Sequence, residues 1–317
     1  MSNLPEELFL DIMRLSSMKA RAAVKMCLLS KRWNHLWEVL PDLNFDLGEF
    51  YSEDHKQYGQ RFFHFVNTML ERRKTDALDK FRLSCFDLCD KRHCSSIERW
   101  ILYAIQHKVR VVELEVCVWS IRRVLTQRNI PCDSIEELHL RLDFMHASDQ
   151  CGDMPSLTHA TLALLTDRFN LYSLDTTLEN LSSVENLELC ASKIKAKSES
   201  PSYDLTVYNL KKLSICLHGF EYFPCIWESL PNLEKLTLWT FCQHSFQHYN
   251  EILNWDEELQ NALMECKMLK TVEVVSSTLD DKKKQLVDDL CQLGDVKIVI
   301  SNRGYPSKKA YPAETSN

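Results

Sequence analysis

The stretch that decides the fold is Ile135-Glu136-Glu137-Leu138-His139-Leu140. Two variable positions separate its first two aliphatic residues, and one variable position separates the second from the third. Seven other segments share this spacing, and the starts of the first and last, (269 − 78)/7, give a period of about 27 residues. The eight segments begin at Leu78, Val111, Ile135, Leu157, Val184, Leu210, Leu233 and Leu269.

Leucine-rich repeats have this spacing and periods of roughly 20–29 residues. The aliphatic residues lie on a short strand and on the turn before it, and they face inward. One unit cannot bury its apolar face alone, so neighbouring units stack into a solenoid. The sequence therefore predicts an α/β leucine-rich-repeat domain over 78–300. We expect about eight repeats of parallel strands with helical or loop returns, and a closing strand at 296–300. The alternative is an unrelated α/β sheet.

The repeats are irregular at one position. A leucine-rich repeat usually has Asn or Cys eight positions after its first Leu, where the side chain joins an internal polar ladder. We therefore expect a solenoid without that ladder and with uneven curvature. The residues at this position are Phe86, Trp119, Asp143, Leu165, Ser192, His218, Phe241 and Ser277.

Helical patterns lie between the expected strands. Apolar residues recur at helical spacing over 62–70. Ser95, with a Glu three residues later, has the spacing of a capping box and precedes an apolar face over 97–105. The segments 256–266 and 278–294 also fit helices, and the second ends on a glycine stop.

The composition excludes several classes of function. Lys+Arg 38 against Asp+Glu 45 gives a net charge of −7, so we expect no basic face for nucleic acid. No uncharged apolar run reaches the roughly 18 residues that a membrane span needs. The N-terminus does not have the pattern of a secretory signal, and 13 cysteines in such a chain indicate reduced thiols. We therefore expect a cytoplasmic or nuclear protein.

No catalytic, cofactor or metal motif stands out. The 6 glycines are scattered, so no glycine-rich phosphate cradle can form. The group Cys85, Cys89, His93 and Cys94 does not have the spacing of a zinc finger, and we expect buried or loop thiols there. We expect no catalytic residue, no cofactor and no metal.

The N-terminal block is a short helical unit rich in large apolar residues. It opens with Leu4-Pro5-Glu6-Glu7-Leu8 and closes with Leu28-Leu29-Ser30-Lys31-Arg32-Trp33 and Leu36-Trp37. A unit of about 40 residues buries too little surface to stay folded alone. Its apolar side chains must therefore pack on the rest of the chain or on another protein.

This block resembles an F-box, and its combination with irregular repeats resembles the plant F-box/leucine-rich-repeat family. The resemblance also includes Arg99-Trp100-Ile101 leading to Val112-Glu113-Leu114. It implies a three-helix F-box over 1–46, a linker and helix over 47–77, and a flexible tail over 301–317. The matching residues are Leu4-Pro5-Glu6-Glu7-Leu8, Ile12, Met18-Lys19, Ala23-Val24, Cys27-Leu28-Leu29-Ser30-Lys31-Arg32-Trp33, Leu36-Trp37, Pro41 and Leu43-Asn44-Phe45-Asp46.

The resemblance also implies a partner. In this family the F-box binds the small Skp-type adaptor of a cullin–RING ubiquitin ligase. Trp33 is the anchor that we favour, and the alternative is that Trp33 and Trp37 seal the F-box against the first repeat. Ser17 stands where the family usually has Pro, and two residues are inserted around 20–22. By position, the adaptor-binding residues would be Leu4, Pro5, Leu8, Ile12, Val24, Leu28, Leu29 and Trp33.

The family's function is that of a non-catalytic substrate receptor in an SCF-type ligase, whose repeats bind a target protein. The alternatives are a protein-binding scaffold outside any ligase and, less favoured, a small-molecule (hormone) sensor. The target itself is not readable from the residues. The variable strand positions give candidate substrate-binding residues, with Trp239 as a candidate hot spot: Arg82, Glu113, Glu115, His139, Arg141, Glu188, Lys212, Lys235 and Trp239. Lys80, Glu137, His159, Asn186 and Glu273 share that register.

Overall fold

The structure is a computed structural model of the chain. It describes residues 5–51, 57–76, 78–88, 91–116, 132–142, 154–164, 181–191, 207–216, 230–240, 263, 266–276, 281–291 and 296–302. In these segments, no helix combines the length and the apolar character needed to cross a membrane.

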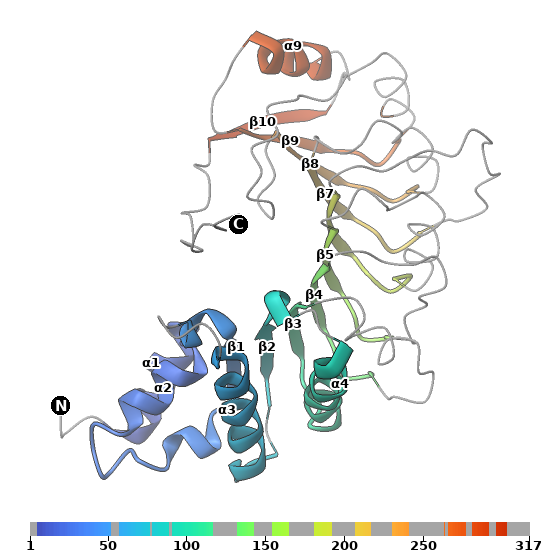
Figure 1. Cartoon of the computed structure of the whole chain (residues 1–317). Helices are drawn as coiled ribbons and strands as arrows, with labels where there is room; N and C mark the ends of the chain where they lie inside the picture. Colours follow the sequence, from blue (N-terminus) through green and yellow to red (C-terminus); the bar gives the residue numbers. More distant parts are fainter. Residues whose placement is uncertain are drawn as a thin grey trace, which may run out of the picture.

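The ten strands of the described segments form one parallel sheet in chain order, from β1 to β10 (Figure 1). Each strand pairs with its neighbours in the chain, as in a leucine-rich-repeat-like solenoid. The chain is therefore of the α/β class. The strands are β1 (Asp42–Asp46), β2 (Lys80–Ser84), β3 (Val111–Glu115), β4 (Glu137–Leu142), β5 (His159–Leu164), β6 (Asn186–Ala191), β7 (Lys212–Cys216), β8 (Lys235–Trp239), β9 (Thr271–Ser276) and β10 (Lys297–Asn302).

The aliphatic pattern builds the core because side chains alternate across each strand. In β2, Phe81 and Leu83 are fully buried, whereas Lys80 and Arg82 on the other face are partly exposed. The strands pair in register, so the buried residues line up from strand to strand. One continuous apolar core therefore runs along the solenoid. Seven of the eight predicted first aliphatic positions, from Leu78 to Leu269, are also buried, and the exception is Val111.

Helices lie at both ends of the sheet. Figure 1 shows α1 and α2 beside β1, and α9 beside β10 at the opposite end. The α-helices are α1 (Glu6–Leu15), α2 (Ala20–Cys27), α3 (Tyr58–Arg72), α4 (Lys91–Gln106) and α9 (Asp281–Leu290). The 3₁₀ helices are η1 (Leu36–Val39), η2 (Leu47–Phe50) and η3 (Phe86–Leu88).

The helical patterns are confirmed for α3 and α4, because the apolar faces at 62–70 and 97–105 are buried. The start of α4 is different. The helix begins at Lys91, so Ser95 lies inside it and is not its N-cap. Helix α9 covers part of the expected 278–294 helix, and Leu286 and Leu290 face the core. The expected 256–266 helix lies almost entirely outside the described residues.

The register expected for β3 is wrong by two residues. Strand pairing aligns Val112 with Phe81 and Leu114 with Leu83, so the first aliphatic position of this repeat is Val109 and not Val111. Val109 is fully buried, whereas Val111 is partly exposed on the other face. The error arose because Val111, Leu114 and Val116 also satisfy the spacing.

The N-terminal block contains a strand and fewer α-helices than expected. Strand β1 lies within residues 1–46 and pairs with β2, so the sheet begins ahead of the repeat at Leu78. Two α-helices are followed by turns over 31–35 and by the 3₁₀ helix η1, and no third α-helix forms in this described part. Ser30 and Asn34 favour turns over helix, which accounts for the break.

The closing strand is confirmed as β10. It continues through Asn302, so Ser301 and Asn302 belong to the sheet and not to a tail. The rest of the expected tail, 303–317, lies outside the described residues.

Candidate functional site

The face of the sheet opposite the aliphatic core, here called the concave face, carries three rows of side chains that run across the strands. Strand register places the candidate substrate-binding residues in these rows. The first row is Asp42, Lys80, Val111, Glu137, His159, Asn186, Lys212, Lys235, Thr271 and Lys297. The second is Asn44, Arg82, Glu113, His139, Thr161, Glu188, Ser214, Thr237, Glu273 and Val299. The third is Asp46, Ser84, Glu115, Arg141, Ala163, Cys190, Cys216, Trp239, Val275 and Ser301.

Glu113 is at the centre of a charge cluster on β2 and β3. Lys80 Nζ lies 2.5 Å from its carboxylate, and Arg82 Nη1 lies 3.3 Å from it. Burial alone would raise the pKa of Glu113, but the hydrogen bond and charge of Lys80, with the charges of Arg82 and His139, outweigh burial and lower it. The two cations are therefore already partly neutralised by this carboxylate.

A second cluster joins β2, β3 and β4 in the third row. Glu115 accepts a hydrogen bond from Ser84 Oγ at 2.8 Å and forms an ion pair with Arg141. Beside it, His139 Nδ1 lies 2.9 Å from Thr161 Oγ1. Neighbouring strands thus satisfy one another's charges. This half of the concave face is polar, but its positive and negative charges are paired, so it does not carry a strong net charge of either sign.

Beyond β4, the side chains of the third row are mostly apolar. Ala163, Cys190, Cys216, Trp239 and Val275 form a buried apolar cluster separate from the main core. Trp239 is 8% exposed, and its Nε1 donates to Ser214 Oγ at 2.7 Å. The indole expected as an open hot spot is therefore a buried, hydrogen-bonded side chain.

The remaining candidates on this half are polar. Lys235 forms an ion pair of 2.6 Å with Glu273, which also accepts a hydrogen bond of 2.5 Å from Ser301 Oγ. Lys212 is exposed next to Lys235, and Glu188 is partly buried. The structure thus brings together Arg82 with Glu113 and Glu115 with Arg141, whereas Glu188 and Lys212 stand apart from these pairs.

The repeat pattern in the sequence did not predict the apolar part of the third row. Ala163, Cys190, Cys216 and Val275 occupy positions that the repeat pattern treats as variable. Small apolar residues recurring three positions after the second aliphatic residue in four of the repeats were the available signal. Strand pairing was needed to show that they form one row.

The cysteine and histidine group around residue 90 is partly described. Cys85 is buried, Cys94 is partly buried, and His93 stacks on Phe63 with ring centroids 4.4 Å apart. Cys89 lies outside the described residues. Across the described segments, no group of three His, Cys, Asp or Glu side chains is arranged to hold a metal ion.

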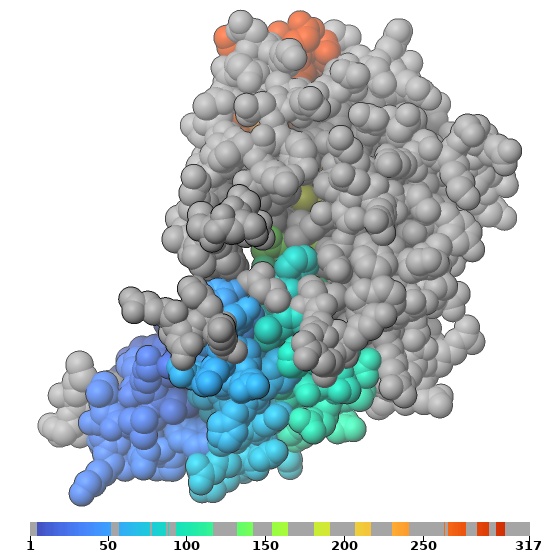
Figure 2. Space-filling view, viewed as in Figure 1, coloured from blue at the N-terminus to red at the C-terminus, as the bar shows by residue number. Residues whose placement is uncertain are grey.

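Helix α1 is apolar on two faces. Phe9 and Met13 point into the core, and Phe9 stacks on Trp33 with centroids 4.3 Å apart. Leu8 and Ile12 are 47% and 42% exposed, although they are large apolar side chains. Figure 2 shows this N-terminal region, in blue, at one end of the molecular surface.

The candidate adaptor-binding residues divide into exposed and buried positions. Leu28 and Leu29, just after α2, are 63% and 73% exposed, and Pro5 is also exposed. Val24 is partly buried and Leu4 lies outside the described residues. Trp33, the favoured anchor, is 3% exposed because it packs on Phe9. It is therefore part of this chain's own core.

Polar contacts fix the N-terminal helices to the sheet. Lys19 Nζ lies 2.6 Å from the Asp46 carboxylate. Arg14 Nη2 donates to Asp79 at 2.8 Å, and Asn44 Nδ2 donates to the Ser17 carbonyl at 2.9 Å. The exposed leucines are thus held in a fixed position relative to β1.

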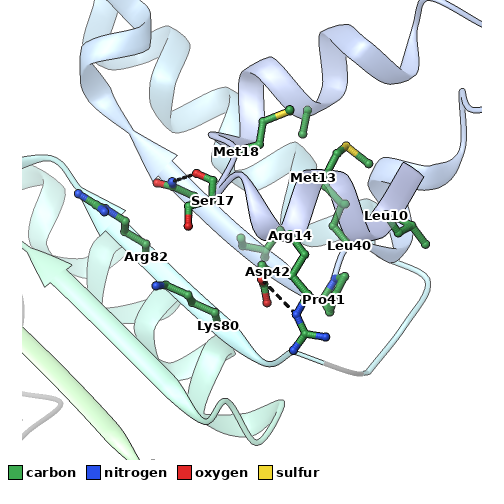
Figure 3. Close-up of a pocket in the computed structure, with 13 residues that line it drawn as sticks. Leu10, Met13, Arg14, Ser17, Met18, Leu40, Pro41, Asp42, Lys80 and Arg82 are labelled. Carbon is green, nitrogen blue, oxygen red and sulfur yellow. Dashed lines mark hydrogen bonds and ion pairs between the residues drawn. The ribbon is translucent and has the colours of Figure 1, made fainter. Parts of the chain in front are cut away.

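A small cavity lies where these helices meet the first two strands (Figure 3). Its volume is about 30 Å³. Residues from α1, from the turn between α1 and α2, and from β1 and β2 line it, among them Met13, Met18, Asp42 and Lys80. Burial is the main cause that raises the pKa of Asp42, and Asp79 adds to it, while Arg14 and Lys80 oppose the shift.

Several F-box/LRR-repeat proteins of Arabidopsis thaliana are similar to this chain. The F-box/LRR-repeat protein At3g59210 of Arabidopsis thaliana is 33% identical over 118 residues, which are 36% of this chain and 23% of that protein. The F-box/LRR-repeat protein At3g44810 of the same plant is 26% identical over 287 residues, which are 85% of this chain and 59% of that protein. The chain is related to the plant F-box/leucine-rich-repeat family.

This relationship confirms the resemblance read from the residues. The F-box/FBD/LRR-repeat protein At5g53840 of Arabidopsis thaliana is a further relative, 28% identical over 120 residues, which are 38% of this chain and 24% of that protein. The matched parts span 23% to 59% of the length of these F-box/LRR-repeat relatives. No family model matches the chain.

Proposed function

We propose that the chain is the non-catalytic substrate-recognition subunit of an SCF-type cullin–RING ubiquitin ligase. Its N-terminal helices would bind a Skp-type adaptor, and its repeats would bind the target protein. The observation that carries the proposal is the exposed apolar surface of the N-terminal helices, formed by Leu8, Ile12, Leu28 and Leu29. Large apolar side chains gathered at one end of a soluble protein are typical of a docking surface. The names of the F-box/LRR-repeat relatives support the same reading.

The proposed mechanism is proximity. A target bound on the concave face would be held at a fixed distance from the adaptor, because the helices are tied to β1 through Asp46 and Asn44. The lysines of the target would then reach a high effective concentration near the conjugating enzyme that carries ubiquitin. This role requires binding and rigidity and no catalytic side chain. We place the protein in the cytoplasm or nucleus, where such ligases act.

Co-purification with a Skp-type adaptor tests the proposal. The double variant Leu28→Ser/Leu29→Ser removes exposed apolar surface, and surface changes of this kind alter stability by only about 0.5 kcal/mol. We expect the dissociation constant for the adaptor to rise roughly tenfold or more. The matched control is Tyr208→Ser/Met268→Ser, which removes two other exposed apolar side chains in turns of the repeats. Wild-type protein that binds no adaptor would contradict the proposal.

A specific observation favours a second candidate, a protein-binding scaffold outside any ligase. Ser17 has φ of 47° in the turn between α1 and α2. Proline, which the family resemblance places at this position, is fixed near φ of −65° and cannot adopt this conformation. The turn between the two helices therefore differs from the one that the resemblance implies. Stable association with another protein, without adaptor, would favour the scaffold.

A further inference from the structure

The sheet ends at β10, and among the described strands none pairs with the outer edge of β10. Lys297 N donates to the Lys270 carbonyl at 2.9 Å, so the backbone groups of Lys297, Val299 and Ser301 point toward β9. The N–H and C=O groups of Ile298 and Ile300 therefore point away from the sheet. Such a row of strand groups is a template for pairing with another strand.

The apolar core is incomplete at this last strand. Strand register aligns Ile298 with Val272 and Ile300 with Val274, and both valines are fully buried. Ile298, in contrast, is only partly buried, and Ile300 is 46% exposed. A further strand beside β10 would cover both isoleucines in the way that β10 covers the valines. The backbone and the side chains of this edge thus favour the same occupant, an extended strand.

The two ends of the sheet are not equivalent. Helices α1 and α2 lie beside β1 (Figure 1), and they are tied to it by Lys19 with Asp46 at 2.6 Å and by Asn44 Nδ2 with the Ser17 carbonyl at 2.9 Å. Strand β10 of one molecule therefore cannot add to β1 of another, which excludes a head-to-tail chain of sheets. A contact between copies through β10 uses the same surface on both and closes at two molecules.

Strand β10 is complementary to itself. A two-fold axis perpendicular to the sheet makes two copies of the strand antiparallel and keeps both core faces on the same side. With the axis at Val299, Ile298 of each protomer lies opposite the partner's Ile300, and these pairs exchange four backbone hydrogen bonds. Val299 lies opposite the partner's Val299. Lys297 lies opposite the partner's Ser301, so like charges do not face each other.

We propose that the chain forms a two-fold dimer through antiparallel pairing of β10. The two sheets become one continuous sheet, and Ile298 and Ile300 of both protomers are covered. The strand itself supplies the aliphatic residues at the spacing that this pairing needs, which favours a second copy as the occupant. The N-terminal helices lie at the opposite end of the sheet from β10 (Figure 1), so the dimer places them at its two outer ends. The dimer does not depend on the proposed ligase role.

Sedimentation equilibrium of the full chain tests the proposal. At about 50 μM we expect a mass that approaches twice the 37.1 kDa of the chain, with a dissociation constant of roughly 10 μM because the contact is small. Ile300→Pro removes an outward N–H and keeps the bonds to β9, and an edge strand tolerates proline there, so it should weaken the dimer about tenfold or more. The control Leu15→Ser removes an 85% exposed side chain at the other end and should leave the dimer unchanged.

Cysteine cross-linking tests the register and does not rely on the proline variant. In Val299→Cys the two new thiols face each other across the axis, with Cα atoms about 4.5 Å apart, which a disulfide can span. In the matched variant Lys297→Cys the two positions are at least about 13 Å apart, beyond the reach of a disulfide. With diamide as oxidant and peptide mapping to distinguish the native cysteines, we expect a disulfide-linked dimer through position 299 and none through position 297.

Two results would overturn the proposal, even if Ile300→Pro failed to fold. One is equal cross-linking of the two cysteine variants, which would indicate random collisions. The other is a monomeric wild-type chain in the sedimentation experiment, which would leave the edge of β10 to a strand from a different protein.

Discussion

Trp33 stacks on Phe9 and is almost fully buried, which makes it a structural residue of the N-terminal helices. We expect Trp33→Ala to lower the free energy of unfolding by about 3–5 kcal/mol, because it removes a large buried side chain. Trp33→Phe keeps a ring against Phe9 and removes a buried Nε1 that has no hydrogen-bond partner, so it should cost less. Urea denaturation followed by circular dichroism measures both. Equal losses for the two variants would contradict this role.

Glu113 predicts a pH dependence of stability. The pKa of its carboxyl is lowered from the ordinary value of 4.5, so its ion pairs stabilise the fold above that value. The contribution is lost as the pH falls through the lowered pKa of the folded state. We expect Glu113→Gln to cost about 1–2 kcal/mol at pH 7 and less near pH 3, below the ordinary pKa of the carboxyl. The unfolding free energies of the two proteins at both pH values provide the measurement.

A matched control for this prediction is Glu136→Gln. Glu136 also forms an ion pair, with Arg110 at 2.7 Å, but its side chain is 44% exposed, against 22% for Glu113. Solvent screens such a pair, so its loss should have a smaller effect than the loss of the Glu113 pairs. A larger loss for Glu136→Gln would show that burial does not set the difference.

Single residues show where sequence reasoning reaches its limit. The aliphatic positions were predictable because burial at strand spacing leaves a periodic signal, as at Phe81 and Leu83. The burial of Trp33 and Trp239 was not, because a large aromatic residue fits a core and a docking surface equally well. The unpartnered oxygens of Asp42 and Asn44 depend on how α1 approaches β1, which no local pattern encodes.

At the scale of elements, the turn between α1 and α2 depends on Ser17. Its φ is 47°, and its N–H donates to the Arg14 carbonyl at 3.0 Å. Ser17→Pro is incompatible with both features and should cost about 2–3 kcal/mol or more. Ser17→Gly suits the positive φ and should be neutral or slightly stabilising. Thermal denaturation of both variants measures this, and a neutral Ser17→Pro would contradict the observed turn.

Strand assignment from the sequence succeeded where one register alone satisfied the spacing. It failed at β3 because overlapping aliphatic residues offered two registers, and only pairing with β2 selects Val109. The corrected register places Cys117 eight positions later, a residue type usual there, although Cys117 lies outside the described residues. Strand β1 was missed because it directly follows the helical block and precedes the first clear repeat.

At the scale of the whole molecule, the N-terminal helices and the sheet should unfold together. Phe45 of β1 packs in the same core as Phe9, and Lys19 and Asn44 tie the two parts. We expect a single urea transition of this part, reported alike by Trp33 and by a probe on β2. A fragment of residues 1–46 should be unfolded by circular dichroism, because it lacks the sheet. A stable, folded fragment would contradict the shared core.

The in-register parallel sheet also acts as a ruler. Each strand adds about 4.8 Å along the sheet, so strand number measures distance from the N-terminal helices. Arg82 on β2 and Lys212 on β7 are five strands apart, or roughly 24 Å along the sheet. Inserting or deleting one repeat would shift every residue beyond it by one strand spacing along the sheet. The residues before it would stay in place. If this face binds a target, as proposed, it would therefore set the position of the target as well as recognise it.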